Sequence, residues 1–181
     1  QAQPKEAQTT CNDCAAGTHA AQNGTSECEE CAAGRFAAEV GTVACQACDA
    51  GTASGEARSK TCTACAAGRY QDEPGQSLCV DCVEGRFRNA GGAAYANCTA
   101  CPSGKHQVEV GKTSCDACAA GTRGVAVVGV AFAEHCVACA AGQAQPKEAQ
   151  TTCNDCAAGT HAAQNGTSEC EECAAGRFAA E

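Results

Sequence analysis

Residues 11–34 read CNDCAAGTHAAQNGTSECEECAAG, so that a Cys-x-x-Cys pair opens the segment and a second pair follows near its end. All 20 cysteines of the 181-residue chain belong to ten such pairs, and each pair continues as CxxCxxG. The step between neighbouring pairs is 17 residues, except for one step of 19 and one of 21. A short fixed period of this kind predicts an array of repeats in which each repeat contacts mainly its neighbours.

A longer period is superimposed on the short one. Residues 1–39 and 143–181 are identical at an offset of 142 residues. We therefore expect residues 1–142 to form one super-repeat of eight short repeats, and residues 143–181 to begin a second, identical super-repeat. Such exact repetition indicates recent tandem duplication or a window onto a longer periodic chain.

Cysteine is abundant in this chain, whereas the residues of an ordinary core are scarce. The chain has no tryptophan, no methionine, two tyrosines and four phenylalanines. Covalent bonds must therefore replace the burial of large apolar side chains. The net charge of −9 argues against a nucleic-acid ligand, which needs a basic face. No run approaches the roughly 20 apolar residues of a membrane span, so we expect none in this segment.

The cysteine pairs have two common uses, and the sequence alone leaves both open. Four thiolates from two pairs can hold a zinc ion, although the 13-residue gap is shorter than that of most zinc ribbons. Alternatively, the second cysteine of each pair bonds to the first of the next, which closes loops worth roughly 3 kcal/mol each in a chain-entropy treatment. Bridging within a pair is the rival disulfide pattern. We favour the ladder between pairs, because it leaves only Cys11 and Cys173 over.

The nine bridges of this hypothesis are Cys14–Cys28, Cys31–Cys45, Cys48–Cys62, Cys65–Cys79, Cys82–Cys98, Cys101–Cys115, Cys118–Cys136, Cys139–Cys153 and Cys156–Cys170. They require an oxidising compartment, so we expect an extracellular or cell-surface location. Acceptor motifs for N-linked glycans agree with this location, and they place candidate glycosylation sites at Asn23, Asn165 and Asn97.

Each repeat has a glycine three residues after its second cysteine, and this regularity indicates a turn with positive φ. Two residues further on, five repeats carry a ring: His19, Phe36, Tyr70, Phe87 and His106. We expect each ring to lie over the neighbouring disulfide. The remaining structure should consist of short β-turns and hairpins with strands of two or three residues and little helix.

The phrases CAAGRF, CAAGRY, CVEGRF and CPSGKH, each followed by a later Gly-x-x-x-Cys, resemble the ephrin-receptor-like cysteine-rich repeat. That repeat is similar in style to the tumour-necrosis-factor-receptor modules. The resemblance covers essentially the whole chain, and it implies an elongated rod stapled by disulfides that link one CxxC to the next. It departs from the family pattern at Ala53, which replaces the ring, and at Arg58, which replaces the later glycine. The family supplies no catalytic residues.

The longest step contains the most apolar stretch of the chain, and a thin array has no core to bury it. One interpretation is a longer loop folded on its own repeat. We prefer a contact surface for assembly, used once per super-repeat. Its residues are Val125, Val127, Val128, Val130 and Phe132.

These observations predict a structural extracellular protein that forms or decorates a filament, fibre or surface appendage. Its partners would be copies of itself and other extracellular structural proteins, and mastigonemes, the flagellar hairs of protists and microalgae, are the concrete case. The alternative is a receptor or adhesion ectodomain stalk that binds a protein or glycan ligand. No catalytic constellation or metal-ligand set stands out, so we expect no enzyme and no cofactor beyond N-linked glycans.

Overall fold

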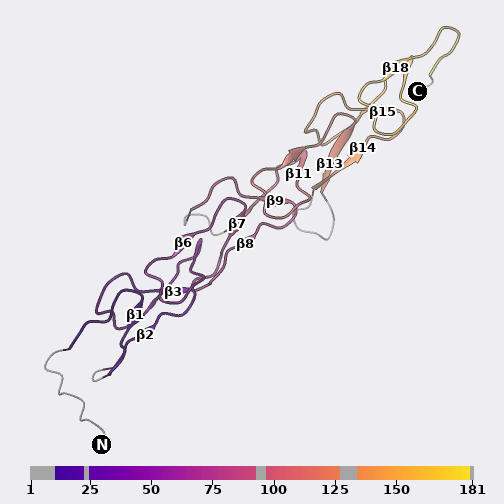
Figure 1. Ribbon diagram of the computed structural model, residues 1–181. Helices are drawn as coiled ribbons and strands as arrows, with labels where there is room; N and C mark the ends of the chain where they lie inside the picture. The colour runs from indigo at the N-terminus through magenta and orange to yellow at the C-terminus, as the bar shows by residue number, and fades with distance from the viewer. Residues whose placement is uncertain (1–10, 23–24, 93–96, 127–133, 180–181) are drawn as a thin grey trace, which may run out of the picture. The chain divides into compact units, whose positions relative to one another are not determined.

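A computed structural model describes residues 11–22, 25–92, 97–126 and 134–179 (Figure 1). In these ranges the chain forms nine two-stranded antiparallel hairpins and no helix, which confirms the predicted fold class. The pairs are β1 (Thr18–His19) with β2 (Glu29–Glu30), β3 (Arg35–Phe36) with β4 (Gln46–Ala47), β5 (Thr52–Ala53) with β6 (Thr63–Ala64), β7 (Arg69–Tyr70) with β8 (Val80–Asp81), β9 (Arg86–Phe87) with β10 (Thr99–Ala100), β11 (Lys105–His106) with β12 (Asp116–Ala117), β13 (Thr122–Ala126) with β14 (Glu134–Ala138), β15 (Gln143–Ala144) with β16 (Asn154–Asp155), and β17 (Thr160–His161) with β18 (Glu171–Glu172).

Each hairpin follows directly from the CxxCxxG motif. Gly17 has a φ of +90°, a conformation that glycine adopts without steric cost, and it turns the chain into β1. The partner strand β2 consists of the two residues between the cysteines of the next pair, so that Thr18 pairs with Glu30. The N–H of Cys31 then donates to the carbonyl of Gly17 at 3.0 Å, which completes the turn.

Successive repeats stack through backbone hydrogen bonds that recur along the chain. The N–H of Gly17 donates to the carbonyl of Ala37 at 2.8 Å, and the N–H of Gly34 donates to that of Ser54 at 2.7 Å. A second contact joins the N–H of Gly41 to the carbonyl of Cys14 at 2.8 Å. Because these donors and acceptors occupy equivalent positions, one repeat presents to the next the same edge that it receives.

The motif glycines also touch the repeat after next. A Cβ atom on Gly17 would lie 2.1 Å from the carbonyl oxygen of Arg58, and one on Gly34 would lie 2.0 Å from that of Gly75. Backbone therefore packs directly on backbone across a distance of about 40 residues in sequence, and only glycine leaves room for it. The sequence predicted the turn but not this second role.

One hairpin differs from the predicted length. Strands β13 and β14 have five residues each, instead of two or three, and Val125 pairs with His135 in their register. The cause is the 21-residue step, whose extra residues extend the ladder on both sides of the turn. In Figure 1 these strands are the most prominent arrows.

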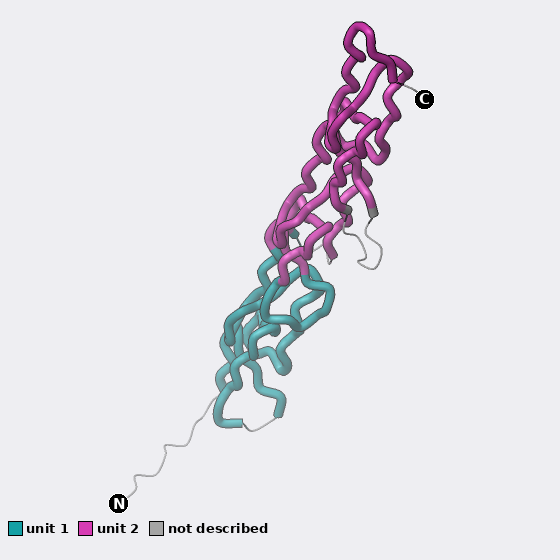
Figure 2. The backbone as a smooth tube through the Cα atoms, turned by 90° about the vertical axis from the view of Figure 1, so that its right-hand side faces the viewer, with its two compact units in different colours: residues 1–65, 71–79, 92–96 teal, residues 66–70, 80–91, 97–181 magenta. Residues whose placement is uncertain are grey.

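The chain divides into two compact units (Figure 2). Unit 1 comprises residues 1–65, 71–79 and 92–96, and unit 2 comprises residues 66–70, 80–91 and 97–181. The boundary passes through single repeats, so these units do not coincide with the 142-residue period. Every disulfide joins two cysteines of the same compact unit.

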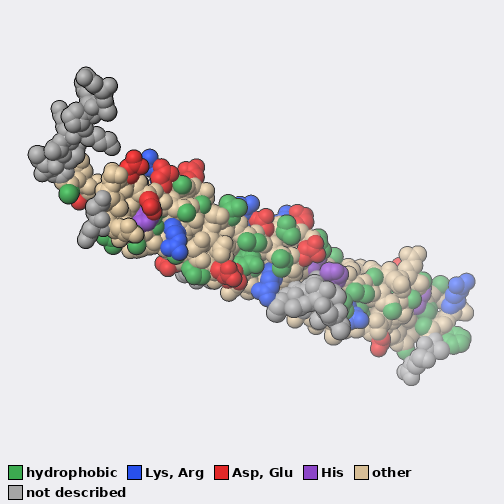
Figure 3. Space-filling view, turned by 90° about the horizontal axis from the view of Figure 1, so that it is seen from below, with side chains coloured by type: hydrophobic (Ala, Val, Ile, Leu, Met, Phe, Trp, Pro, Cys, Tyr) green, Lys and Arg blue, Asp and Glu red, His purple; other side chains and the backbone are tan. Residues whose placement is uncertain are grey.

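The buried interior consists mainly of sulfur and small side chains. The largest side chains that are fully buried in the described residues are all second cysteines of their pairs, namely Cys31, Cys48, Cys65, Cys82, Cys118 and Cys139. Valines such as Val40 and Val43 remain 66% and 69% exposed. On the face shown in Figure 3, hydrophobic side chains are scattered among polar ones. Covalent bridges thus take the place of a conventional core.

Three buried glutamines brace the loops in the same way. Gln71, Gln107 and Gln145 are each 6% exposed or less. In each case Nε2 donates to the carbonyl seven residues later at 2.7–2.9 Å, and Oε1 accepts the N–H two residues later at 2.9–3.1 Å. Both ends of the buried amide are therefore satisfied, and the loop is tied to its own repeat.

Candidate functional site

The recurring chemical feature of the fold is a disulfide at each repeat. The second cysteine of each pair bonds to the first cysteine of the next, with Cα–Cα distances of 5.3–5.8 Å. These are the nine pairs of the ladder hypothesis, and only two residues separate one bridge from the next. Cys11 and Cys173 have no disulfide partner, the first being exposed and the second half-buried.

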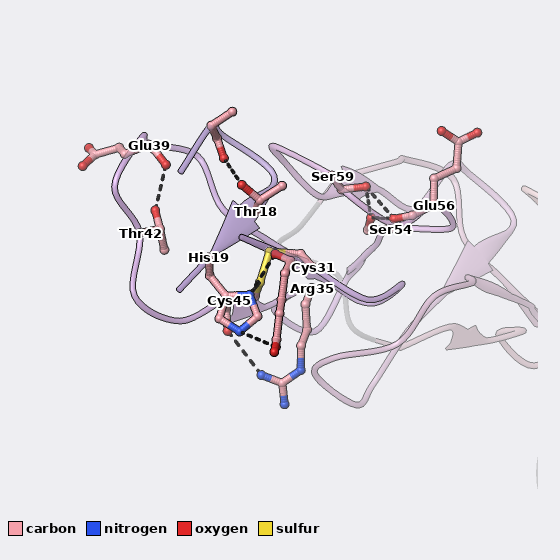
Figure 4. Close-up of a disulfide and its surroundings, with 12 residues drawn as sticks. Thr18, His19, Cys31, Arg35, Glu39, Thr42, Cys45, Ser54, Glu56 and Ser59 are labelled. Carbon is pink, nitrogen blue, oxygen red and sulfur yellow. Dashed lines mark hydrogen bonds and ion pairs between the residues drawn. A yellow bond between two sulfur atoms is a disulfide. The ribbon is translucent and has the colours of Figure 1, made fainter. Parts of the chain in front are cut away.

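The close-up in Figure 4 shows the surroundings of the Cys31–Cys45 bridge. The ring of His19, at the end of β1, lies with its Nδ1 atom 3.3 Å from the Sγ atom of Cys45. The same Nδ1 is 3.2 Å from the carbonyl oxygen of Glu29, while Nε2 is 3.8 Å from the carboxylate of Glu29. Arg35 donates from Nη1 to the carbonyl of Cys45 at 3.2 Å. Polar donors thus surround one sulfur of this bridge.

The same arrangement occurs a second time in the chain. Nδ1 of His106, at the end of β11, lies 3.1 Å from the Sγ atom of Cys136 in the Cys118–Cys136 bridge. In both cases a ring from one repeat covers the disulfide of the next, which confirms the predicted ring position for these two histidines. The two sites lie in different compact units.

Each of these histidines forms a cluster with two cysteines that has the composition of a metal site. The ring nitrogen and the two sulfur atoms lie within 4.8 Å of one another, in His19–Cys31–Cys45 and in His106–Cys118–Cys136. Zinc and related ions bind the thiolate form of cysteine. Since both sulfurs of each cluster are bonded to each other, the clusters in this oxidised state are histidine-covered disulfides.

The structure places the predicted glycosylation sites in different settings. Asn165 is exposed, and its Oδ1 atom accepts the N–H of Ala141 at 2.9 Å. Asn97 is exposed next to the bonded and buried Cys98. Asn23 lies outside the described residues. Glycan occupancy at all three sites remains a prediction.

The predicted assembly contact lies mostly outside the described residues. Val125 is half-buried in β13. The other four members of the set are not among the residues that the structure describes, namely Val127, Val128, Val130 and Phe132. Their role in assembly therefore stays a prediction.

Sequence reasoning missed a strained backbone at two positions. Arg58 and Ala149 have φ values of 60° and 59° and are the described non-glycine residues with positive φ. Both occupy the position at which other repeats carry a later glycine, such as Gly75. The signal was present, because Arg58 was recognised as a departure from the pattern, but the conformation it would keep was not inferred.

Comparison with known families fits this geometry. The family model described as tyrosine-protein kinase ephrin type A/B receptor-like matches residues 17–59, 51–95 and 90–128, which together cover more than half of the chain. The chain belongs to this family. Its cysteine-rich repeats are non-catalytic extracellular modules, which indicates an extracellular or secreted protein. No curated protein matches the chain.

In the described part of this family member, no helix has the length and apolar character needed to cross a membrane.

Proposed function

We propose that this chain is part of an extracellular structural protein, which forms or decorates a filament, fibre or surface appendage of the mastigoneme type. The observation that carries the proposal is the exact repetition of residues 1–39 at 143–181, combined with stacking contacts that are equivalent from repeat to repeat. A surface that offers the same edge it receives can propagate without closing, which is the geometric requirement for a fibre.

The covalent connectivity supports a load-bearing role. Each bridge bypasses the loop that it closes, so that a pull along the chain is carried by disulfides and by the two-residue segments between them. In most repeats 13 residues are bypassed, because the bridge joins cysteines 14 apart. The oxidised chain therefore resists extension even when its hydrogen bonds break. Copies of the same protein and other extracellular structural proteins are the proposed partners, and N-linked glycans at Asn23, Asn165 and Asn97 would coat the surface.

Membership of the ephrin-receptor-like family favours one alternative, namely a receptor or adhesion stalk. In that case the repeats would hold a protein or glycan ligand site at a distance from the membrane. The exact super-repeat argues against it, since a specific ligand site is normally built once, whereas identical copies create identical surfaces.

Electron microscopy of the full protein, isolated from its source without reductant, distinguishes the two functions. The structural proposal predicts filaments whose axial period corresponds to one 142-residue super-repeat. Separate flexible molecules that end in a globular head or in a membrane anchor would contradict it and would favour the receptor or adhesion stalk.

A further inference from the structure

We propose that the Cys31–Cys45 bridge is a site of selective reduction by small dithiols, and that the Cys118–Cys136 bridge is a second, weaker site of the same kind. Both bridges have a histidine Nδ1 atom within 3.3 Å of the first-cysteine sulfur of a CxxC pair, Cys45 in one case and Cys136 in the other. The other bridges of the ladder have Phe, Tyr, Ala or Arg at the corresponding ring position where the structure describes that position.

The surroundings of His19 fix the hydrogen on the relevant nitrogen. The carbonyl oxygen of Glu29 is an acceptor only, and it lies 3.2 Å from Nδ1. Nδ1 must therefore carry the hydrogen, which it shares with the Sγ atom of Cys45 at 3.3 Å. A disulfide sulfur is a weak acceptor, whereas a thiolate is a strong one, so this N–H bond strengthens when the bridge opens.

The charges around this sulfur also favour the thiolate. Arg35 donates to the carbonyl of Cys45, which brings a guanidinium close to the bridge, although solvent screens this exposed charge. The Glu29 carboxylate lies on the far side of the ring, 3.8 Å from Nε2. In the second site Thr122 takes the place of Arg35, and for this reason we rank Cys118–Cys136 below Cys31–Cys45.

The exchange reaction passes through a Cys45 thiolate whichever sulfur is attacked first. If a thiolate of the dithiol attacks Cys31, it forms a mixed disulfide there, and Cys45 leaves as the thiolate beside His19. If it attacks Cys45, Cys31 leaves first, and the second thiol of the reagent then displaces Cys45. In both cases two electrons pass to the protein bridge, the dithiol becomes a cyclic disulfide, and two cysteines are released.

The Cys48–Cys62 bridge is a matched internal control. It joins cysteines 14 apart, as Cys31–Cys45 does, and its second cysteine is equally buried, at 0% against 1% exposure. Its ring position holds Phe36 and its Arg35 position holds Thr52, so neither of the two donors is present. A difference in reduction between these bridges therefore reports on the histidine and the arginine rather than on loop length or burial.

The experiment treats the natively folded chain with increasing dithiothreitol near neutral pH, traps free thiols by alkylation, and locates them by mass spectrometry. Cys45 lies beyond the duplicated residues 1–39, so its peptide is unique. We expect Cys31–Cys45 to be reduced roughly tenfold more readily than Cys48–Cys62, the size of effect that one hydrogen bond to a charged group produces. Cys118–Cys136 should lie between them.

Two substitutions test the role of the ring. His19→Phe, which installs the residue present at position 36, should bring Cys31–Cys45 to the level of Cys48–Cys62. The reciprocal Phe36→His should make Cys48–Cys62 more reducible by a similar factor, and it tests the idea even if the first variant misfolds. Equal reduction of all nine bridges, or an order that neither substitution changes, would overturn the proposal.

Discussion

At the residue scale, the fold depends on backbone conformations that side chains resist. The CxxCxxG glycines have φ values near +80°, and the later glycines of the repeats behave similarly, as Gly75 does at 77°. Arg58 and Ala149 keep this conformation without being glycine. A left-handed conformation costs a residue with a Cβ atom about 1 kcal/mol or more. These two positions therefore retain strain that the repeat geometry imposes.

Ala149→Gly should relieve this strain. The N–H of residue 149 donates to the carbonyl of Cys118 at 2.8 Å, so it reports directly on the local structure. We expect the free energy of local opening to rise by about 1 kcal/mol, measured by native-state hydrogen exchange at this N–H. Ala120→Gly is the control, because Ala120 is exposed and does not have positive φ, and it should bring no gain. An unchanged or lower value for Ala149→Gly would show that position 149 is not strained.

At the scale of the elements, each hairpin is stapled by its own bridge and is also held by the repeats that follow it. Gly104 shows the contact with the repeat after next, because a Cβ atom there would lie 2.1 Å from the carbonyl oxygen of Ala149. Gly142 has the same backbone conformation, with a φ of +84° against +80°, but a Cβ atom there would meet no described atom within 4 Å. The two glycines thus separate the cost of conformation from the cost of close packing.

Gly104→Ala should be far more destabilising than Gly142→Ala. Both variants incur about 1 kcal/mol for alanine at positive φ, but only the first must also displace backbone from 2.1 Å. The expected result is a marked loss of hydrogen-exchange protection at residue 149 in Gly104→Ala. In Gly142→Ala the loss should be modest and confined to its own turn. Equal losses in the two variants would mean that packing against the second-next repeat contributes little.

At the scale of the whole molecule, much of the organisation could be predicted from the spacing of cysteine and glycine. The ladder, the short hairpins and the position of His19 over a bridge follow from local chemistry within one or two repeats. The contact between Gly104 and Ala149 could not be foreseen, because it depends on the rotation between successive repeats, which the spacing does not encode. The five-residue strands β13 and β14 were also missed, since an inserted segment can extend a ladder or bulge out of it with the same length.

The central claim is that the disulfide ladder carries tension through the chain. Single-molecule pulling on the two ends, before and after reduction, tests this claim most directly. Each opened bridge should release 14 residues in most repeats, or roughly 45 Å at about 3.5 Å per residue less the Cα–Cα distance. Complete reduction of the nine bridges should therefore lengthen the chain by roughly 400 Å, while the oxidised chain shows no such steps. Equal extension of the oxidised and reduced chains would contradict the account.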